Sequence, residues 1–512
     1  MLQENISANQ NLEVENLNLR SQLAKAVEKN KHLESQISWL MEQVNTLKRA
    51  QFGKGSEKWE SQEQLKMVFN EVEAEVQKEE DAKTIEVKSY AKKKRGYRKP
   101  LPQNLPREVV RIELPESEQV SESGEQLKII GWEVSEKLKY EPAKTTVIEY
   151  HRAKYGADSG DYEKTAPPVP SVIPKGIATP ELLSAIIVSK YADGLPLYRL
   201  EEIFTRQGID LSRGTMARWV VQASKSLTGI RNVLSDKLSE SYAISCDETK
   251  VQVLKEKGRA PEDLSWMIVR SNPTEDKKIV LFDYSCARNQ KLIGELFLDY
   301  SGKVICDGLN IYDRLESDLL KRFGCNMHSR RKFESAAVDG AKSGKGLASQ
   351  VMDLYKKIYA HEEEIKNLDP PEKVLERNKV QKPLFDAIKD IVDQNQLKVP
   401  HKSKLGLAFH YFQNEYKYLT LYLDDGFMPP DNGYIERIIR KFAIGRNNWL
   451  FSDTPQGAEA SSLFYSLVIT AKLNGINPYT ALVKIFTEIP LAKTIDDYER
   501  ITNYLLSPAT LH

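Results

Sequence analysis

Apolar residues recur with a spacing of seven along the first fifty positions of the chain. One position of the repeat is filled by Leu12, Leu19, Ala26, Leu33, Leu40 and Leu47. The position three residues earlier is filled by Asn9, Asn16, Leu23, Asn30, Ile37 and Val44. This seam predicts a coiled coil, in which buried asparagines set register and oligomeric state at a cost in stability. We expect residues 1–50 to dimerise the chain; the alternative is a long helix that folds back on its own protein.

Charge rather than periodicity dominates the next segment. Residues 71–83 are acidic, and residues 92–99, which include Arg95 and Arg98, are basic. Such polar runs bury too little apolar surface to fold alone, so residues 51–105 are predicted to be a flexible linker. The basic run suits the DNA minor groove, whose negative potential attracts arginine. It is equally typical of a solvated run of charges.

Residues 106–165 contain a short stretch, TTVIEYHRAKY, in which apolar and polar residues alternate. Alternation predicts a half-buried strand, so we expect a small β module here. A proline-rich segment, residues 166–176, separates this module from the rest of the chain.

Helical periodicity follows in residues 176–238. Two helical patterns there flank a turn at Gly208, and Ser212 is a good N-cap for the second helix. This arrangement predicts a helix-turn-helix, which would present Arg213 and Arg218 to DNA. The alternative is a helical hairpin that packs on the following domain.

Short apolar runs separated by turns begin at residue 240. Strands are predicted for SYAISCDETKVQVL, LSWMIVRS, KKIVLFDYS and GKVICDGLN, with a helix, QKLIGELFLD, before the last of them. Asp247 and Asp307 each come at the end of an apolar run. An acid at the tip of a buried strand is held rigidly while its carboxylate points out of the sheet.

A third acid lies on a helix predicted within residues 431–451, for which Asp431 and Asn432 are good N-caps. Ile435, Ile438 and Phe442 give this helix one apolar stripe, and Glu436 lies on another face. Cations are close to it at Arg437, Arg440, Lys441 and Arg446. Alone, this pattern is typical of a surface helix with a Glu436–Arg440 ion pair. Together with the two strand acids, Glu436 completes a set that can hold two divalent ions about 4 Å apart for attack on phosphodiesters.

Composition limits the remaining possibilities. The 512 residues predict two to four domains, and the net charge of +1 means that any affinity for nucleic acid comes from local patches. No apolar run reaches the roughly 18 residues of a membrane span, and the polar N-terminus lacks the features of a signal peptide. None of the four cysteines, Cys246, Cys286, Cys306 and Cys325, forms a CxxC pair. These features predict a cytoplasmic protein without a zinc ribbon or disulfide framework.

Several of these motifs resemble those of the DDE transposases of the IS66 insertion-sequence family. They are CDETKVQVL, ICDGLNIYDRL, GCNMHSRRKFESA, DNGYIERIIRKFAIGRNNWLF and GAEASSLFYSLVITAKLNGINPYTAL. The resemblance implies a multidomain α/β protein with an RNase H-like catalytic domain. It also implies that Asp247, Asp307 and Glu436 are its catalytic, metal-binding acids.

The same resemblance adds further residues. It implies that His328 touches the scissile phosphate or orients an acid; the alternative is a structural histidine. Arg330, Arg331 and Lys332 follow it and suit contact with phosphates. Members of the family usually carry two zinc-binding CxxC motifs where this chain has Val120, Ser123, Ala157 and Gly160. We therefore expect no zinc.

The predicted domains follow from these patterns. They are a coiled coil at 1–50, a linker at 51–105, a β module at 106–165, a helix-turn-helix-like domain at 176–238, a catalytic domain at 240–485 with a helical insertion at about 326–425, and a C-terminal tail at 486–512.

The sequence predicts a DNA transposase that binds the terminal inverted repeats of an insertion sequence and cuts and joins DNA with two Mg²⁺ ions, for which Mn²⁺ can substitute. Expected partners are double-stranded DNA at transposon ends and target, a second copy of the chain, and accessory proteins of the same element, with no membrane. The expected location is the bacterial cytoplasm, at the nucleoid. Two alternatives stay open: a non-catalytic DNA-binding dimer derived from a transposase, and a glycosidase that uses two carboxylates.

Overall fold

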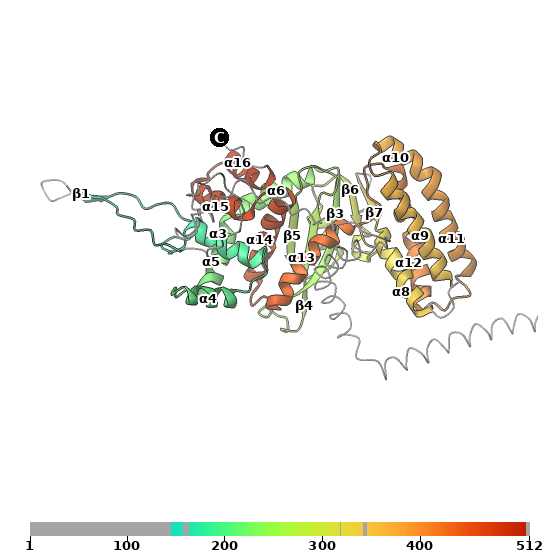
Figure 1. Ribbon diagram of the computed structural model, residues 1–512, viewed down its shortest axis with the longest axis horizontal. Helices are drawn as coiled ribbons and strands as arrows, with labels where there is room; N and C mark the ends of the chain where they lie inside the picture. The colour runs from blue at the N-terminus through green and yellow to red at the C-terminus, as the bar shows by residue number, and fades with distance from the viewer. Residues whose placement is uncertain (1–144, 157–162, 318, 341–345, 508–512) are drawn as a thin grey trace, which may run out of the picture. The chain divides into compact units, whose positions relative to one another are not determined.

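The computed structural model describes residues 145–156, 163–317, 319–340 and 346–507 (Figure 1). The chain divides into two compact units, one formed by Gln43–Pro167 and the other by Met1–Glu42 together with Pro168–His512. The predicted coiled coil, the linker with Arg95 and Arg98, and most of the predicted β module lie outside the described residues.

The described part of the smaller unit is a short hairpin. Strands β1 (Lys154–Gly156) and β2 (Glu163–Thr165) pair antiparallel. Residues 145–153 form no strand, so the half-buried strand predicted for TTVIEYHRAKY is wrong over most of its length. The reason is that no described residue of this unit covers their apolar side chains: Val147 is 91% exposed.

The larger unit contains a five-stranded mixed sheet in the order β5-β4-β3-β6-β7. Its strands are β3 (Ala243–Gln252), β4 (Leu264–Ser271), β5 (Val280–Ser285), β6 (Gly302–Cys306) and β7 (Leu320–Gly324). The first three pair antiparallel, while β6 and β7 run parallel to β3. Helix α7 (Gln290–Leu296) connects β5 to β6. The predicted order of three strands, a helix and a fourth strand is confirmed, and β7 was missed.

Helix α14 (Pro455–Leu473) protects one edge of this sheet. It packs along β5 and is buried over most of its length (Figure 1). Ser466 Oγ accepts the Phe282 N–H at 2.8 Å, and Thr470 Oγ1 accepts the Val280 N–H at 3.0 Å. Four residues of helix span about the same length as two residues of strand, so the spacings match. These bonds occupy backbone donors that an edge strand would otherwise offer to another chain.

Four helices precede the sheet: α3 (Pro180–Tyr191), α4 (Leu197–Arg206), α5 (Arg213–Ser226) and α6 (Thr228–Ser239). Gly208, with φ of 76°, lies in the turn between α4 and α5, where a left-handed backbone favours glycine. Ser212 Oγ accepts the Thr215 N–H and caps α5. The predicted helix pair is therefore present. Its buried face packs on α14 and α3, and its contact with DNA stays a prediction.

A helical segment lies between β7 and the helix that carries Glu436, as predicted. It comprises α8 (Asn326–Gly340), α9 (Leu347–Glu364), α10 (Pro370–Glu376), the π-helical turn η3 (Arg377–Gln381), α11 (Lys382–Asn395), α12 (Lys404–Thr420) and the 3₁₀ turn η4 (Leu421–Asp424). These helices form a second core cluster, which includes Phe333, Tyr355, Phe385 and Phe412 and extends to Ile305 and Phe323 of the sheet. Helix α12 also packs against β7.

The C-terminal part continues as α13 (Gly433–Trp449), α14, α15 (Pro478–Glu488), the turn η5 (Ile489–Leu491) and α16 (Ile495–Leu506). The tail predicted for residues 486–512 thus contains a packed helix. Ile501 and Leu505 of α16 are buried where it meets α6 and α15. Among the described residues, no helix is both long enough and apolar enough to cross a bilayer.

Candidate active site

The sequence suggested that Asp247 lies at the end of a strand, but it lies within β3. The parallel pairing of β3 with β6 stops at Ser245↔Ile305, but antiparallel pairing with β4 continues to Gln252. On the β6 side, β3 is therefore unpaired from Asp247 onward. Continuing the same register places Asp247 level with Asp307, the residue after β6, and on the same face of the sheet.

The backbone around Asp307 is held by its neighbours. Asp307 Oδ1 accepts the Leu309 N–H at 3.1 Å, and its carbonyl accepts a bond from Arg322 at 3.0 Å. A Cβ on Gly308 would lie 2.6 Å from the ring of Tyr411, so only glycine fits there. Because Arg322 also donates to Glu415 of α12 at 2.6 Å, the loop that carries Asp307 is fixed to the helical segment.

The start of α13 is fastened beside Asp247. The Asn432 side chain donates to the carbonyl of Cys246 at 2.8 Å, and its backbone N–H donates to Cys325 Sγ at 3.2 Å. Asn432 consequently makes no side-chain cap on α13, although its residue type predicted one. These bonds bring Glu436, in the first turn of the helix, to the sheet edge that carries Asp247.

Negative charge accumulates at this edge. Burial and, to a lesser extent, the charges of Glu248, Asp307 and Glu436 together raise the pKa of Asp247 to about 8. Burial and Glu248 likewise raise the pKa of Asp307 to about 7, against the opposing effect of Arg288 and Arg322. Asp247 is thus near enough to Asp307 and Glu436 to be repelled by both, which favours a cation between them.

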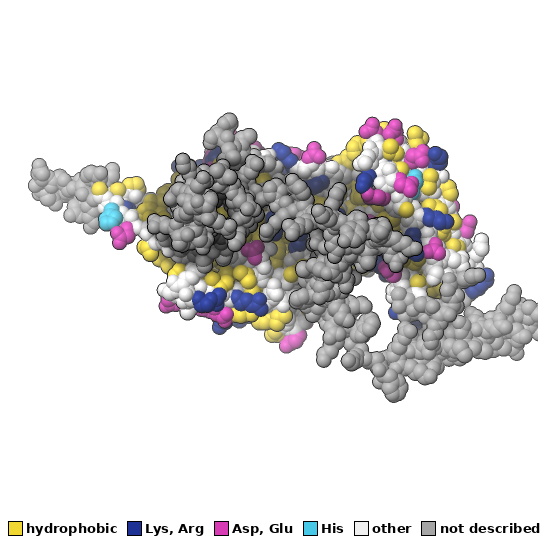
Figure 2. Space-filling model, in the orientation of Figure 1, with side chains coloured by type: hydrophobic (Ala, Val, Ile, Leu, Met, Phe, Trp, Pro, Cys, Tyr) yellow, Lys and Arg dark blue, Asp and Glu magenta, His cyan; other side chains and the backbone are white. Residues whose placement is uncertain are grey.

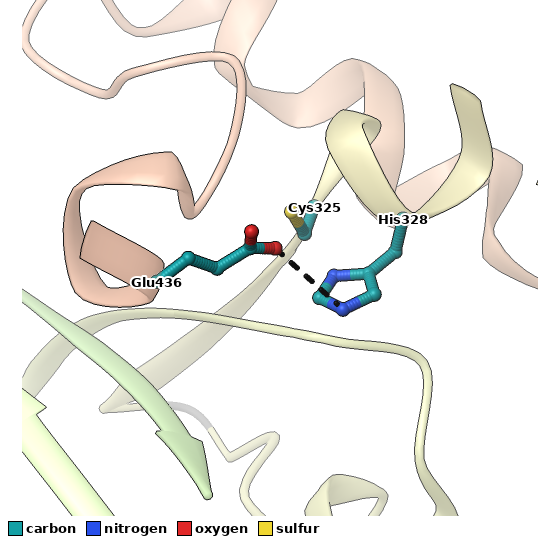
Figure 3. Close-up of side chains that lie close together, drawn as sticks. All are labelled: Cys325, His328 and Glu436. Atoms are coloured by element: carbon teal, nitrogen blue, oxygen red, sulfur yellow. Dashed lines mark ion pairs between the residues drawn. The ribbon is translucent and has the colours of Figure 1, made fainter. Parts of the chain in front are cut away.

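Glu436 has two close partners on α8: Arg331, whose contact was not predicted, and His328, for which the resemblance implied contact with the phosphate or with an acid. Arg331 of α8 binds its carboxylate through both terminal nitrogens, with Nη1 2.9 Å from Oε1. His328 Nε2 lies 3.8 Å from the same Oε1 (Figure 3). The ion pair with Arg440, which the helix pattern alone would suggest, does not form, since Glu436 turns toward α8 instead.

The predicted triad is not the tightest set of possible ligands here. Among the described residues, the one group of three whose ligand atoms all lie within 4.8 Å of one another is Cys325, His328 and Glu436. Asp247 and Asp307 are outside that group. Their role as metal ligands together with Glu436 stays a prediction.

Sequence reasoning missed a buried acid next to the site. Glu248 follows Asp247 in β3, and its side chain is 3% exposed. It forms an ion pair with Arg288 and accepts the Tyr312 hydroxyl at 2.6 Å. Tyr312 belongs to the motif ICDGLNIYDRL, but no local pattern connects Arg288 with Glu248.

The predicted DNA-contacting cations differ in how free they are. Arg437, Arg440 and Lys441 are exposed on α13. Arg331 and Lys332 are exposed on α8, but Arg331 binds Glu436 and Lys332 lies over the ring of Tyr411. Arg446 is engaged, because its guanidinium donates to Thr249 Oγ1 at 3.3 Å and to the Lys250 carbonyl.

Other predicted cations contact neighbouring side chains. Arg330 lies over the ring of Tyr359, Arg213 pairs with Glu201 at 3.9 Å, and Arg218 donates to Thr215. Lys and Arg side chains are also visible over α4 on the face shown in Figure 2.

Comparisons with known proteins match this geometry to a family. The profile described as "Transposase IS66 family" matches residues 175–460, "Transposase C of IS166 homeodomain" matches 39–110, and "IS66 C-terminal element" matches 466–502. The uncharacterized protein y4qI of Sinorhizobium fredii is 26% identical over 501 residues, which cover 94% of this chain and 91% of that protein. The uncharacterized protein y4jD of the same organism is 28% identical over 413 residues, which cover 77% and 79%.

Proposed function

The chain belongs to the IS66 family of transposases, and from this premise we propose that it cuts DNA at the ends of an insertion sequence and joins them to a target. The main support is the placement of Asp247 and Asp307 side by side on neighbouring parallel strands, with Glu436 close enough to affect Asp247. The strand order and directions also support an RNase H-like catalytic domain. We also propose that this catalytic domain is separate from the helical region at 176–238.

The donor set at the sheet edge fits the divalent ions that DDE transposases generally use. Carboxylate oxygens are the ligands that Mg²⁺ prefers, and the described residues give Asp247 no ion-pair partner. In the proposal, Asp247, Asp307 and Glu436 hold the ions. When bound, these would lower the pKa of the attacking hydroxyl and stabilise charge on the phosphate. We propose that the bound ions are Mg²⁺, for which Mn²⁺ can substitute.

The residues around the acids would position DNA. Water first attacks the phosphorus at the transposon end; the bond to the 3′ oxygen breaks, and that oxygen takes a proton. The freed 3′-hydroxyl then attacks a target phosphate in the same way, so one site serves both reactions. Arg330 and Lys332 lie on α8 close to His328 and suit contact with the phosphates on either side. Dimerisation through residues 1–50, and any accessory proteins, would bring two ends together.

The test is cleavage of labelled transposon ends by the full chain with Mg²⁺. Asp247→Asn and Asp307→Asn should each slow cleavage by more than about a hundred-fold, the low end of the effect of a positioned catalytic group. Asp299→Asn, which alters an exposed acid outside the site, is the matched control and should cleave normally. Full cleavage by either site variant would refute the assignment. Binding of the ends without cleavage by the unaltered chain would favour the non-catalytic alternative.

A further inference from the structure

Three metal-ligating side chains from two distant parts of the chain meet at Glu436, one of the proposed catalytic acids. Cys325 directly precedes α8, His328 lies in the first turn of α8, and Glu436 lies in the first turn of α13 (Figure 3). Their ligand atoms lie within 4.8 Å of one another. A metal ion bound by sulfur, nitrogen and oxygen would need these atoms to approach by about 1 Å more, which small rotamer changes can supply.

The surroundings of two of these side chains suit a bound ion. Cys325 is fully buried, and its Sγ accepts the Asn432 N–H, a contact of the kind that orients a ligand from outside a metal site. His328 Nδ1 is buried and has no hydrogen-bond partner among the described residues. A buried polar nitrogen without a partner costs free energy that binding can recover. The spacing Cys-x-x-His at a helix start holds both ligands on one rigid element.

The donor set distinguishes this cluster from the carboxylate site. Sulfur, imidazole nitrogen and one carboxylate, with a fourth position for water, suit Zn²⁺ and similar thiophilic ions. Mg²⁺ takes oxygen ligands and binds sulfur poorly. Two neighbouring sites of different chemistry therefore share one residue, Glu436.

We propose that Cys325, His328 and Glu436 form a binding site for a thiophilic divalent cation such as Zn²⁺, and that an ion there withdraws Glu436 from Asp247 and Asp307. The second half of this statement rests on the proposed function. Arg331 now neutralises Glu436, but its side chain is 50% exposed and is free to turn into solvent when a cation takes its place. This proposal differs from the expectation of no zinc. That expectation rested on the absence of CxxC pairs and did not consider the Cys-x-x-His spacing of Cys325 and His328.

Cobalt binding to the full chain tests the site without any reaction. Co²⁺ bound by a thiolate gives a sulfur-to-metal charge-transfer absorption in the near ultraviolet, which oxygen ligands do not give. We expect this band to appear on titration with Co²⁺ and to be displaced by Zn²⁺. Absence of the band in the unaltered chain would overturn the proposal.

Variants show which residues bind the Co²⁺ ion that gives this absorption band. Cys325→Ser keeps an acceptor for the Asn432 N–H, so it should fold while losing the band. Cys286→Ser, which alters the exposed cysteine outside the cluster, should keep it. His328→Gln should weaken Co²⁺ binding and serves as the second variant if Cys325→Ser melts early. A band that persists in both Cys325→Ser and His328→Gln would refute the site.

Inhibition of cleavage by Zn²⁺ separately tests whether a bound ion withdraws Glu436 from Asp247 and Asp307. With Mg²⁺ present, one equivalent of Zn²⁺ should abolish most cleavage by the unaltered chain but not by Cys325→Ser. Cleavage that is insensitive to Zn²⁺, despite the cobalt band, would overturn the withdrawal of Glu436. A cobalt band with no cleavage even without Zn²⁺ would leave the metal site standing and contradict the proposed function instead.

Discussion

Asp247 and Glu248 are neighbours in β3 but have opposite surroundings. Glu248 is satisfied by Arg288 and Tyr312, whereas within the described part of the chain Asp247 accepts only the N–H of the following residue. Successive residues of a strand point to opposite faces, so the two carboxylates meet different layers. An acid that is mostly buried without a counter-charge is a candidate for binding a ligand.

The raised pKa of Asp247 predicts how stability depends on pH without divalent ions. In the unfolded chain this carboxyl loses its proton near its ordinary value of 3.8, but in the folded chain it keeps the proton up to about 8. Between these values the folded state binds more protons, so stability falls as pH rises. Asp247→Asn should flatten this fall, measured by urea unfolding at a series of pH values with chelator present.

Two further measurements make that prediction specific. Asp299→Asn should keep the pH profile of the unaltered chain, because this acid is exposed. Added Mg²⁺ should restore stability toward pH 8 in the unaltered chain but much less in Asp247→Asn. Equal slopes for the unaltered chain and Asp247→Asn over this range would show that Asp247 is not the group responsible.

At the scale of elements, the position of α13 depends on one side chain at its start. Asn432 is fully buried and ties the helix to β3 at Cys246. Asn432→Ala should cost about 1–3 kcal/mol of stability, because a buried carbonyl loses its partner. It should also slow cleavage, since Glu436 is then held less firmly at the sheet edge.

Asn448 at the other end of α13 provides the control. Its side chain also donates to a backbone carbonyl, that of Gly194, but it is exposed. Asn448→Ala should therefore change stability by less than about 0.5 kcal/mol in denaturant unfolding. Similar losses of stability in the two variants would mean that the hydrogen bond from Asn432 to Cys246 does not stabilise the fold more than an exposed one.

Local signals predicted the elements better than their connections. The apolar run LSWMIVRS predicted β4, and Ser212 predicted the start of α5, since both depend on residues close in sequence. The strand β7 was missed because five residues, LKRFG, carry too short a pattern. Asn432 was taken for a cap because its residue type favours one, but its side chain bonds a strand 186 residues away.

At the scale of the whole molecule, the last helix joins the two ends of the larger unit. Helix α16 packs on α6, which precedes the sheet, and the carbonyl of Leu505 accepts a bond from Asn474 of the α14 end at 3.1 Å. Residues that looked like a tail thus complete the core that α3–α6 share with the sheet.

A pair of identical substitutions measures that contribution. Leu505 is 1% exposed and Leu491, in the turn before α16, is 61% exposed. Leu505→Ala should cost about 2–5 kcal/mol, because it leaves a cavity in the core. Leu491→Ala should cost less than about 0.5 kcal/mol. Thermal unfolding of both variants checks this, and equal melting temperatures would contradict the packing of α16.

The sequence by itself determined strands β3 to β6, most helices and the motifs that carry Asp247, Asp307 and Glu436, because periodicity and short motifs are local properties. Tertiary structure alone decided the partners of these acids. Arg331 reaches Glu436 across 105 residues of sequence, and Cys325 and His328 meet the same carboxylate. These contacts exist only once β7 and α12 have fixed α8 beside α13, and such packing between distant segments leaves no periodic trace in the chain.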